Sequence, residues 1–176
     1  MTAAPYIKVL VLDVDGVLTD GKIALAGQPH DETKYFHVHD GLGISLWQKA
    51  GFHTIIISGR NAQCVELRAD ELQIQHVKQG SIDKVADINL FLQQLGYSPK
   101  EACFVGDDLG DIPVMQYVGY SIAVQDAADE VKTIADWTTK RMGGCGAVRD
   151  AIEHLMRANG SWDKTVSILS MEHAKQ

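Results

Sequence analysis

The sequence predicts an α/β fold in which helices cover a mostly parallel, doubly wound sheet. Short apolar segments alternate with segments of helical spacing along the chain, which is the order expected of successive β-α-β units. The first apolar segment, residues 7–12, is almost continuously apolar, which indicates a strand buried on both faces. A chain of 176 residues can bury a sizeable core, so we expect one domain over residues 1–176.

The remaining elements follow in chain order from their apolar spacing and their end signals. Gly51 and Gly96 each follow a helical segment, and Pro113 falls in the first turn of another, where proline is tolerated. Ser81 is placed to cap the helix that precedes Gly96. We expect strands at 54–57, 74–77, 102–105, 120–124 and 137–139, and helices at 43–50, 62–71, 83–95, from 111, 127–135 and 147–158. The tail, about residues 159–176, has only weak periodicity.

An insertion of about residues 21–38 separates the first strand from the first helix. Residues 22–25 and 35–38 have strand composition and flank a turn at Gly27-Gln28-Pro29, which predicts a β-hairpin. An isolated hairpin is marginally stable in water. Pairing with copies of itself would bury its apolar side chains and cover its open edges.

Composition excludes several classes of partner. The net charge of −7 with no long basic run argues against nucleic acid and against anionic membranes. No stretch of 18 uninterrupted apolar residues suggests a membrane span, and the N-terminus lacks a secretion signal. Cys64, Cys103 and Cys145 show no C-x-x-C spacing, as expected of thiols in a reducing cytoplasm. We therefore expect a cytoplasmic protein.

Three predicted strands end in polar clusters: Asp13-Val14-Asp15, Ser58-Gly59-Arg60 and residues 106–111. Parallel strands bring such ends to one edge of the sheet, where ligands bind. Asp13 and Asp15 share a face of an extended strand, and two crowded carboxylates repel unless a cation or a shared proton relieves them. The pattern indicates a hard metal ion such as Mg²⁺, and the third cluster, at Asp107, also has the composition of a metal site.

Each of these residues also has a purely structural interpretation. The first two acids could be a turn acid beside a surface acid, and Asp107 or Asp108 could cap a helix. Ser58, next to Gly59, could hold a phosphoryl oxygen or cap the following helix. Lys84 lies at the start of a helix, where the dipole disfavours a cation, and this indicates a nearby anion unless the lysine is simply solvated.

Taken together, the motifs resemble those of the haloacid dehalogenase superfamily. DVDGVLTDG, ISGR, GSIDK and GDDLGD match its four motifs in order. The hairpin insertion and the segments FHVHDGLGI, QGSIDK, GDDLGDIPVM and GGCGAVRD resemble the 3-deoxy-D-manno-octulosonate 8-phosphate phosphatase family over about residues 9–155. The resemblance implies the Rossmann-like haloacid dehalogenase fold without a separate cap domain. It also implies a phosphoric monoester hydrolase of lipopolysaccharide sugar biosynthesis that uses Mg²⁺.

The resemblance also implies a role for each motif residue. Asp13 would attack phosphorus and form an aspartyl-phosphate, while Asp15 would act as general acid and then as general base. Ser58 and Lys84 would hold the phosphoryl oxygens. Mg²⁺ would bind the Asp13 carboxylate, the Asp15 backbone carbonyl and Asp107. Asp111 and Asp108 would support the site by orienting Lys84 or a metal-bound water.

For the sugar acid, the resemblance implies contacts from Asp15 and Lys84 and from a second set of residues: His37, Val38, His39, Asp40, Gly41, Arg60 and Arg68. An arginine pairs with a carboxylate through two parallel hydrogen bonds, although two ordinary surface arginines would give the same sequence. His39 and Ser45 stand where the family often has arginines, which leaves the sugar open. A nine-carbon 2-keto-3-deoxynononate or N-acylneuraminate 9-phosphate is the alternative substrate.

The resemblance further implies a homotetramer in which hairpins of four subunits assemble and neighbours cover each active site. Arg149 would help the C-terminal segment to reach a neighbouring site. Two other classes remain open at this point: a non-catalytic oligomerisation module of the same fold, and a phosphoacceptor receiver domain. The receiver domain fits less well, because Ser58 follows the strand that should carry its acceptor aspartate.

Overall fold

The fold is described from a computed structural model that covers residues 5–25 and 32–173. Its centre is a sheet of six strands in the order β5-β4-β1-β6-β7-β8, with every neighbouring pair parallel. The strands are β1 (Val9–Leu12), β4 (His53–Ile57), β5 (His76–Lys78), β6 (Ala102–Gly106), β7 (Tyr120–Ala123) and β8 (Trp137–Thr138). The predicted doubly wound α/β fold is confirmed.

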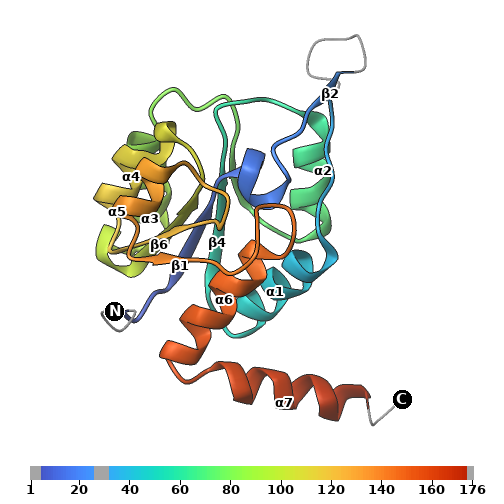
Figure 1. Ribbon diagram of the computed structural model, residues 1–176. Helices are drawn as coiled ribbons and strands as arrows, with labels where there is room; N and C mark the ends of the chain where they lie inside the picture. The colour runs from blue at the N-terminus through green and yellow to red at the C-terminus, as the bar shows by residue number, and fades with distance from the viewer. Residues whose placement is uncertain (1–4, 26–31, 174–176) are drawn as a thin grey trace.

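Helices cover both faces of this sheet (Figure 1). One face carries α1 (Val38–Lys49), α2 (Gln63–Glu71) and α6 (Ala147–Ala158), and α1 packs closely against α6. The other carries α3 (Lys84–Leu95), α4 (Ile112–Tyr117) and α5 (Asp129–Ile134). Short helical turns lie at Val14–Leu18, Pro99–Glu101 and Leu109–Asp111. No helix among the described residues is long and apolar enough to cross a membrane.

Strand β1 lies at the centre of the sheet, between β4 and β6. All four of its side chains are fully buried, as the apolar run predicts. Leu12 at its end is level with Ile56 of β4 and with Val105 of β6. The chain leaves β1 toward β4 on one side and returns to β6 on the other, so the strand order reverses here. The carboxyl ends at this reversal are the expected place for a ligand.

The insertion forms a separate two-stranded antiparallel sheet of β2 (Ala24–Leu25) and β3 (Glu32–Thr33) on the carboxyl side of the main sheet (Figure 1). The predicted hairpin exists, but the second arm predicted at 35–38 is wrong. Phe36 makes only an isolated bridge with Thr19, and Val38 already begins α1. The His37 ring accepts a hydrogen bond from the His39 amide, and this N-cap starts the helix before Gly43. The predicted turn at 27–29 lies outside the described residues.

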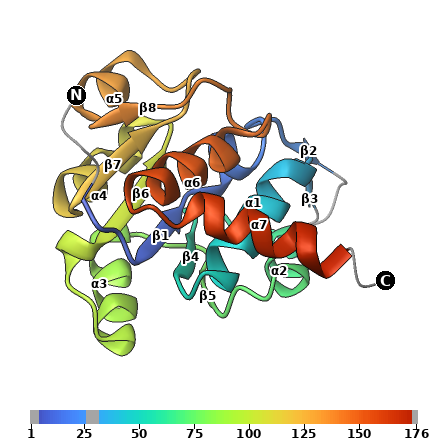
Figure 2. The same ribbon diagram turned by 90° about the horizontal axis from the view of Figure 1, so that it is seen from below.

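Four smaller differences from the expected elements have local causes. The strand predicted at 74–77 runs from His76 to Lys78. Asp83 caps α3, while the Ser81 hydroxyl donates instead to Asp87 at 2.7 Å. Asp111 ends a helical turn, and α4 begins one residue later. The weakly periodic tail contains α7 (Trp162–His173), which runs from the end of α6 past α1 and lines a shared hollow with it (Figure 2).

Candidate active site

Asp13 follows β1 directly, and a tight loop after it is closed against β6. The Asp13 amide donates to the Val105 carbonyl at 3.2 Å, and the Thr19 amide donates back to the Val14 carbonyl at 3.0 Å. Gly16 has φ +87°, and a Cβ there would lie 2.1 Å from the Asp107 carboxylate. Glycine at position 16 therefore lets the loop after β1 approach the acid that follows β6.

A lysine ammonium joins the first and third of the predicted polar clusters. Lys84 Nζ lies 2.7 Å from Asp13 Oδ1 and 2.7 Å from Asp111 Oδ1. The other oxygen of Asp111 accepts from the Asp107 amide at 3.0 Å, which fixes the loop after β6. Lys84 is the first residue of α3, where the helix dipole disfavours a cation, and these two carboxylates compensate for that. The placement of Lys84 beside anions agrees with the interpretation of a nearby negative charge.

The charges at this edge do not balance. Carboxylate oxygens of Asp13, Asp107 and Asp111 lie within 4.8 Å of one another, with one ammonium between them. Burial, together with the charge of Asp111, raises the pKa of Asp13 to about 7. Burial and the Asp13 charge raise the pKa of Asp107 to about 8. Burial acts to lower the pKa of Lys84, but Asp13 and Asp111 outweigh it and raise that pKa. Such an acidic oxygen cluster suits a hard divalent cation.

These side chains open into a cleft of about 730 Å³, a size typical of small-molecule sites. Its walls include Asp13, Asp15, Ser58, Arg60, Lys84, Asp107, Asp108 and Asp111. Ser58 is buried, and its hydroxyl accepts from the Arg60 amide at 3.1 Å. Ala62, not Ser58, stands at the N-cap of α2, so the capping interpretation of Ser58 is wrong.

The two acids after β6 have different surroundings. Asp108 is the N-cap of the turn Leu109–Asp111 and accepts from the Leu109 amide at 2.8 Å. Asp107 caps no helix, and its carboxylate faces Gly16 in the loop after β1. The capping interpretation therefore applies to Asp108, while Asp107 is the acid that joins the metal-type cluster.

Sequence reasoning missed two residues of the hairpin. Lys34 pairs with the Asp15 carboxylate, and its Nζ lies 3.0 Å from Glu32 Oε2. Glu32 also pairs with Arg60, which lies in the cleft wall. The only signal in the sequence was two opposite charges on one face of a short strand segment, which is common on solvated hairpins.

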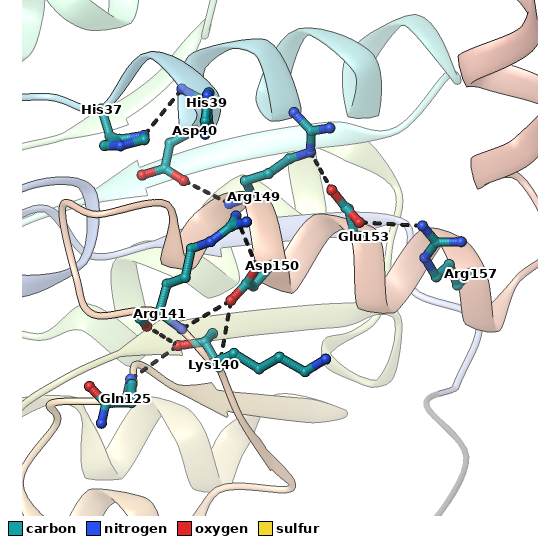
Figure 3. Close-up of polar contacts among 11 residues, drawn as sticks. His37, His39, Asp40, Gln125, Lys140, Arg141, Arg149, Asp150, Glu153 and Arg157 are labelled. Carbon is teal, nitrogen blue, oxygen red and sulfur yellow. Dashed lines mark hydrogen bonds and ion pairs between the residues drawn. The ribbon is translucent and has the colours of Figure 1, made fainter.

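Most of the predicted sugar contacts lie outside this cleft. Asp40, in the first turn of α1, is buried and accepts from the Arg149 amide at the start of α6, at 2.7 Å (Figure 3). Arg68 pairs with Glu71 at 2.7 Å, and its other guanidinium nitrogen lies 3.5 Å from the His37 carbonyl. A Cβ on Gly41 would meet Arg68. Residues 37–41 and Arg68 thus form a second group, which we call the α1–α2 group.

Arg149 and the glycine-rich segment before it connect several parts of the molecule. The Gly144 amide donates to the Val17 carbonyl at 2.9 Å, which packs residues 143–146 on the loop after Asp13. Arg149 Nε lies 2.8 Å from Glu153, and its guanidinium lies 5.0 Å from the ring centre of Trp162 (Figure 3 shows the ion pair). Within this chain, Arg149 therefore helps to hold the start of α7 against α6.

Comparison with known proteins agrees with this geometry. A family model for haloacid dehalogenase-like hydrolases matches residues 76–152. The 3-deoxy-D-manno-octulosonate 8-phosphate phosphatase of Salmonella typhi is 43% identical over 164 residues, covering 93% of this chain and 87% of that protein. The crystal structure of the phosphatase of that name from Yersinia pestis is 39% identical, with a TM-score of 0.87, over 92% of this chain and 86% of the other.

A third relative carries ligands. The crystal structure of the Moraxella catarrhalis phosphatase, in complex with a magnesium ion, a phosphate ion and KDO, is 34% identical with a TM-score of 0.89. It aligns over 94% of this chain and 95% of the other. Identity at this level over nearly the whole chain, together with four motifs at one sheet edge, settles the family. The chain belongs to the 3-deoxy-D-manno-octulosonate 8-phosphate phosphatase family, phosphoric monoester hydrolases of the haloacid dehalogenase superfamily.

Proposed function

We propose that this protein hydrolyses 3-deoxy-D-manno-octulosonate 8-phosphate to the free sugar acid and phosphate, through an aspartyl-phosphate. The observation that carries the proposal is the buried contact of Asp13 with Lys84 in a cleft that also contains Asp15 and Asp107. In this proposal Asp13 is the nucleophile, Lys84 is the fixed cation and Asp15 is the acid, and all three side chains line the same cleft. The names of the relatives supply the substrate.

The reaction needs two displacements at phosphorus. In the first, an Asp13 oxygen attacks phosphorus, the bond to the sugar oxygen breaks, and Asp15 gives that oxygen a proton. In the second, Asp15 takes a proton from water as the water attacks the aspartyl-phosphate, which releases phosphate and restores Asp13. Lys84 and the Ser58 hydroxyl hold the phosphoryl oxygens during both.

The acidic residues fit a magnesium ion. Asp13, Asp107 and Asp111 carry more carboxylate groups than Lys84 can balance. Burial first, and then the neighbouring carboxylates, raise the pKa values of Asp13 and Asp107. The Asp13 and Asp107 carboxylates and the Asp15 backbone carbonyl would hold the ion. When bound, Mg²⁺ neutralises the charges of the nucleophile and of the phosphate that approaches it.

Sugar recognition divides between two places. Arg60 lies in the cleft wall, and we assign the sugar carboxylate to it, because a guanidinium can bind a carboxylate through two parallel hydrogen bonds. We propose that the α1–α2 group, apart from the buried Asp40, contributes from an adjacent subunit of a homotetramer assembled through the hairpin. Leu25, Tyr35 and Val38 are 77%, 71% and 75% exposed in the single chain, and an interface there would bury them. Three free cysteines, Cys64, Cys103 and Cys145, agree with a cytoplasmic location.

One feature favours a second substrate. His39 and Ser45 stand in and beside the α1–α2 group where the family often has arginines. Fewer cations would hold the ulosonate carboxylate less tightly, and a nine-carbon sugar acid 9-phosphate is then the alternative. The same residues would be used for catalysis in either case.

A phosphate-release assay with Mg²⁺ tests the proposal. The panel contains 3-deoxy-D-manno-octulosonate 8-phosphate, the nine-carbon 9-phosphates and simple hexose phosphates. We expect the eight-carbon ester to have the highest kcat/KM, and removal of Mg²⁺ with EDTA to abolish release. A preference for hexose phosphates would contradict the role of Arg60. If no phosphate is released from any ester, the remaining interpretation is a non-catalytic oligomerisation module of the same fold.

A further inference from the structure

We propose that Lys34 is a positioning residue that holds the Asp15 carboxyl in place for proton transfer to the leaving group. The inference rests on the role proposed for Asp15. The Lys34 side chain is completely buried, although its chain neighbours Thr33 and Tyr35 are exposed. Its ammonium pairs with Asp15 Oδ1 and lies 3.0 Å from Glu32 Oε2.

Burial of a lysine is costly unless carboxylates compensate for the lost water. Burial acts to lower the pKa of Lys34, but the hydrogen bond to Asp15 and the ion pair with Glu32 outweigh it and raise the pKa above its usual range. Lys34 is therefore a permanent cation beside the candidate acid. It is separate from Lys84, which pairs with Asp13 and Asp111.

The contact fixes one oxygen of Asp15. With Oδ1 held by Lys34, Oδ2 is the oxygen available to the leaving group in the cleft that Asp15 lines. General acid catalysis depends on placing that oxygen within hydrogen-bond reach of the ester oxygen. A free aspartate side chain can rotate away, and the buried ammonium prevents this.

The same ion-pair chain reaches the predicted sugar-recognition residue. Glu32, which contacts Lys34, also pairs with Arg60 in the cleft wall. The charges alternate from Asp15 through Lys34 and Glu32 to Arg60, so each buried charge has an opposite neighbour. Strand β3 thereby connects the proton-transfer residue to the arginine proposed to bind the sugar carboxylate.

The test compares leaving groups. p-Nitrophenolate leaves without a proton, whereas a sugar alkoxide needs one, and kcat/KM reports only the steps up to aspartyl-phosphate formation. In Lys34→Met we expect kcat/KM to fall about 30-fold or more for the sugar acid phosphate, but less than about 3-fold for p-nitrophenyl phosphate. Equal losses with both esters would overturn the proposal, because they would indicate a general structural defect.

Two further variants make the comparison specific. Lys34→Arg keeps the cation and should recover part of the loss with the sugar ester. Lys22→Met is the matched control, because Lys22 lies on the same insertion but is 85% exposed and pairs only with Asp20 at 3.0 Å among the described contacts. Lys22→Met should leave kcat/KM unchanged for both esters. An equal loss in Lys22→Met would assign the effect to the hairpin as a whole and overturn the proposal.

If Lys34→Met does not fold, Glu32→Gln replaces it, because this change removes the charge that anchors Lys34 but keeps the lysine. We expect a smaller decrease in kcat/KM than in Lys34→Met, again only for the sugar ester. An equal decrease with both esters would overturn the proposal. Failure of the proposed function has a different signature: wild-type protein would hydrolyse p-nitrophenyl and alkyl phosphates but no sugar acid phosphate. The leaving-group comparison then uses glycerol phosphate as its alkyl ester.

Discussion

The proposed catalytic edge, which consists of Asp13, Lys84, Asp107 and Asp111, and the α1–α2 group are built in different ways. At the catalytic edge, three acids and a lysine from distant parts of the chain converge because β1 and β6 are adjacent and in register. In the α1–α2 group, residues 37–41 at the start of α1 contact Arg68 of α2 and the start of α6, and none of them lines the cleft. Sheet topology within one chain thus brings the acidic cluster and Lys84 to one edge of the sheet, whereas the α1–α2 group stays outside the cleft, and we propose that it acts on the substrate from an adjacent subunit.

The largest effect should come from the catalytic edge. Asp13→Asn removes the nucleophile but keeps the size of the side chain, so we expect kcat for the best ester to fall at least about 10⁴-fold. Phosphate release measures this, and trapping of labelled protein after acid quench shows whether the aspartyl-phosphate is lost. Asp70→Asn, an exposed acid on α2, is the matched control and should have wild-type kcat. Residual activity within 10-fold of wild type in Asp13→Asn would contradict the nucleophile assignment.

An effect of intermediate size, on KM, should distinguish Arg60 from Arg68. Arg60 lines the cleft, so Arg60→Ala should raise KM for the sugar acid phosphate about 10- to 100-fold and leave KM for p-nitrophenyl phosphate unchanged. Arg68→Ala should raise KM less, because Arg68 lies outside the cleft of its own chain and is already paired with Glu71, and we propose that it acts from an adjacent subunit.

Mixed oligomers test that second statement. In tetramers that combine Asp13→Asn subunits with Arg68→Ala subunits, the intact Arg68 of one subunit can serve the intact Asp13 of the next. A fraction of the sites should therefore show wild-type KM. If every active site in the mixture keeps the raised KM of Arg68→Ala, Arg68 binds substrate in its own subunit. The α1–α2 group would then not act from an adjacent subunit.

The elements that position catalysis could be predicted because their signals are local. An apolar run that ends in Asp13 and an apolar run that ends before Asp107 each identify a strand and its carboxyl end, and parallel neighbours meet there. The hairpin was less predictable. Residues 35–38 have strand composition, but the His37 cap and packing against α6 make Val38 the start of a helix. Tertiary contacts override propensity there.

The Lys34–Asp15 and Asp40–Arg149 contacts could not be predicted for a different reason. They join residues 19 and 109 positions apart. A lysine in a short hairpin and an aspartate near a helix start both have ordinary local roles, and nothing local distinguishes them from a buried ion pair or a cap of another helix. The family resemblance assigned Asp40 to the sugar, while its contacts in the structure are with the α6 backbone.

The smallest effect concerns this cap. Asp40→Ala removes the acceptor for the Arg149 amide and should lower the free energy of unfolding by about 1–2 kcal/mol, as measured by urea denaturation. Asp40→Asn keeps an oxygen acceptor and should cost less. Neither substitution should change KM for the sugar acid phosphate, because Asp40 is buried away from the cleft. A raised KM in Asp40→Asn with unchanged stability would mean that Asp40 takes part in sugar recognition.

The pH dependence of stability gives a second measure of the same cap. Burial raises the pKa of Asp40, although the hydrogen bond from Arg149 opposes this. An acid whose pKa is higher in the folded state binds more protons there than in the unfolded state, so its contribution to stability falls as the pH rises from about 3.9, the usual aspartate value, through the folded value. Asn cannot titrate, so stability should decline less with rising pH in Asp40→Asn than in the wild type. Parallel curves for the two proteins would mean that the Asp40 carboxylate, despite its burial, is stabilised as an anion by the N-terminus of α6.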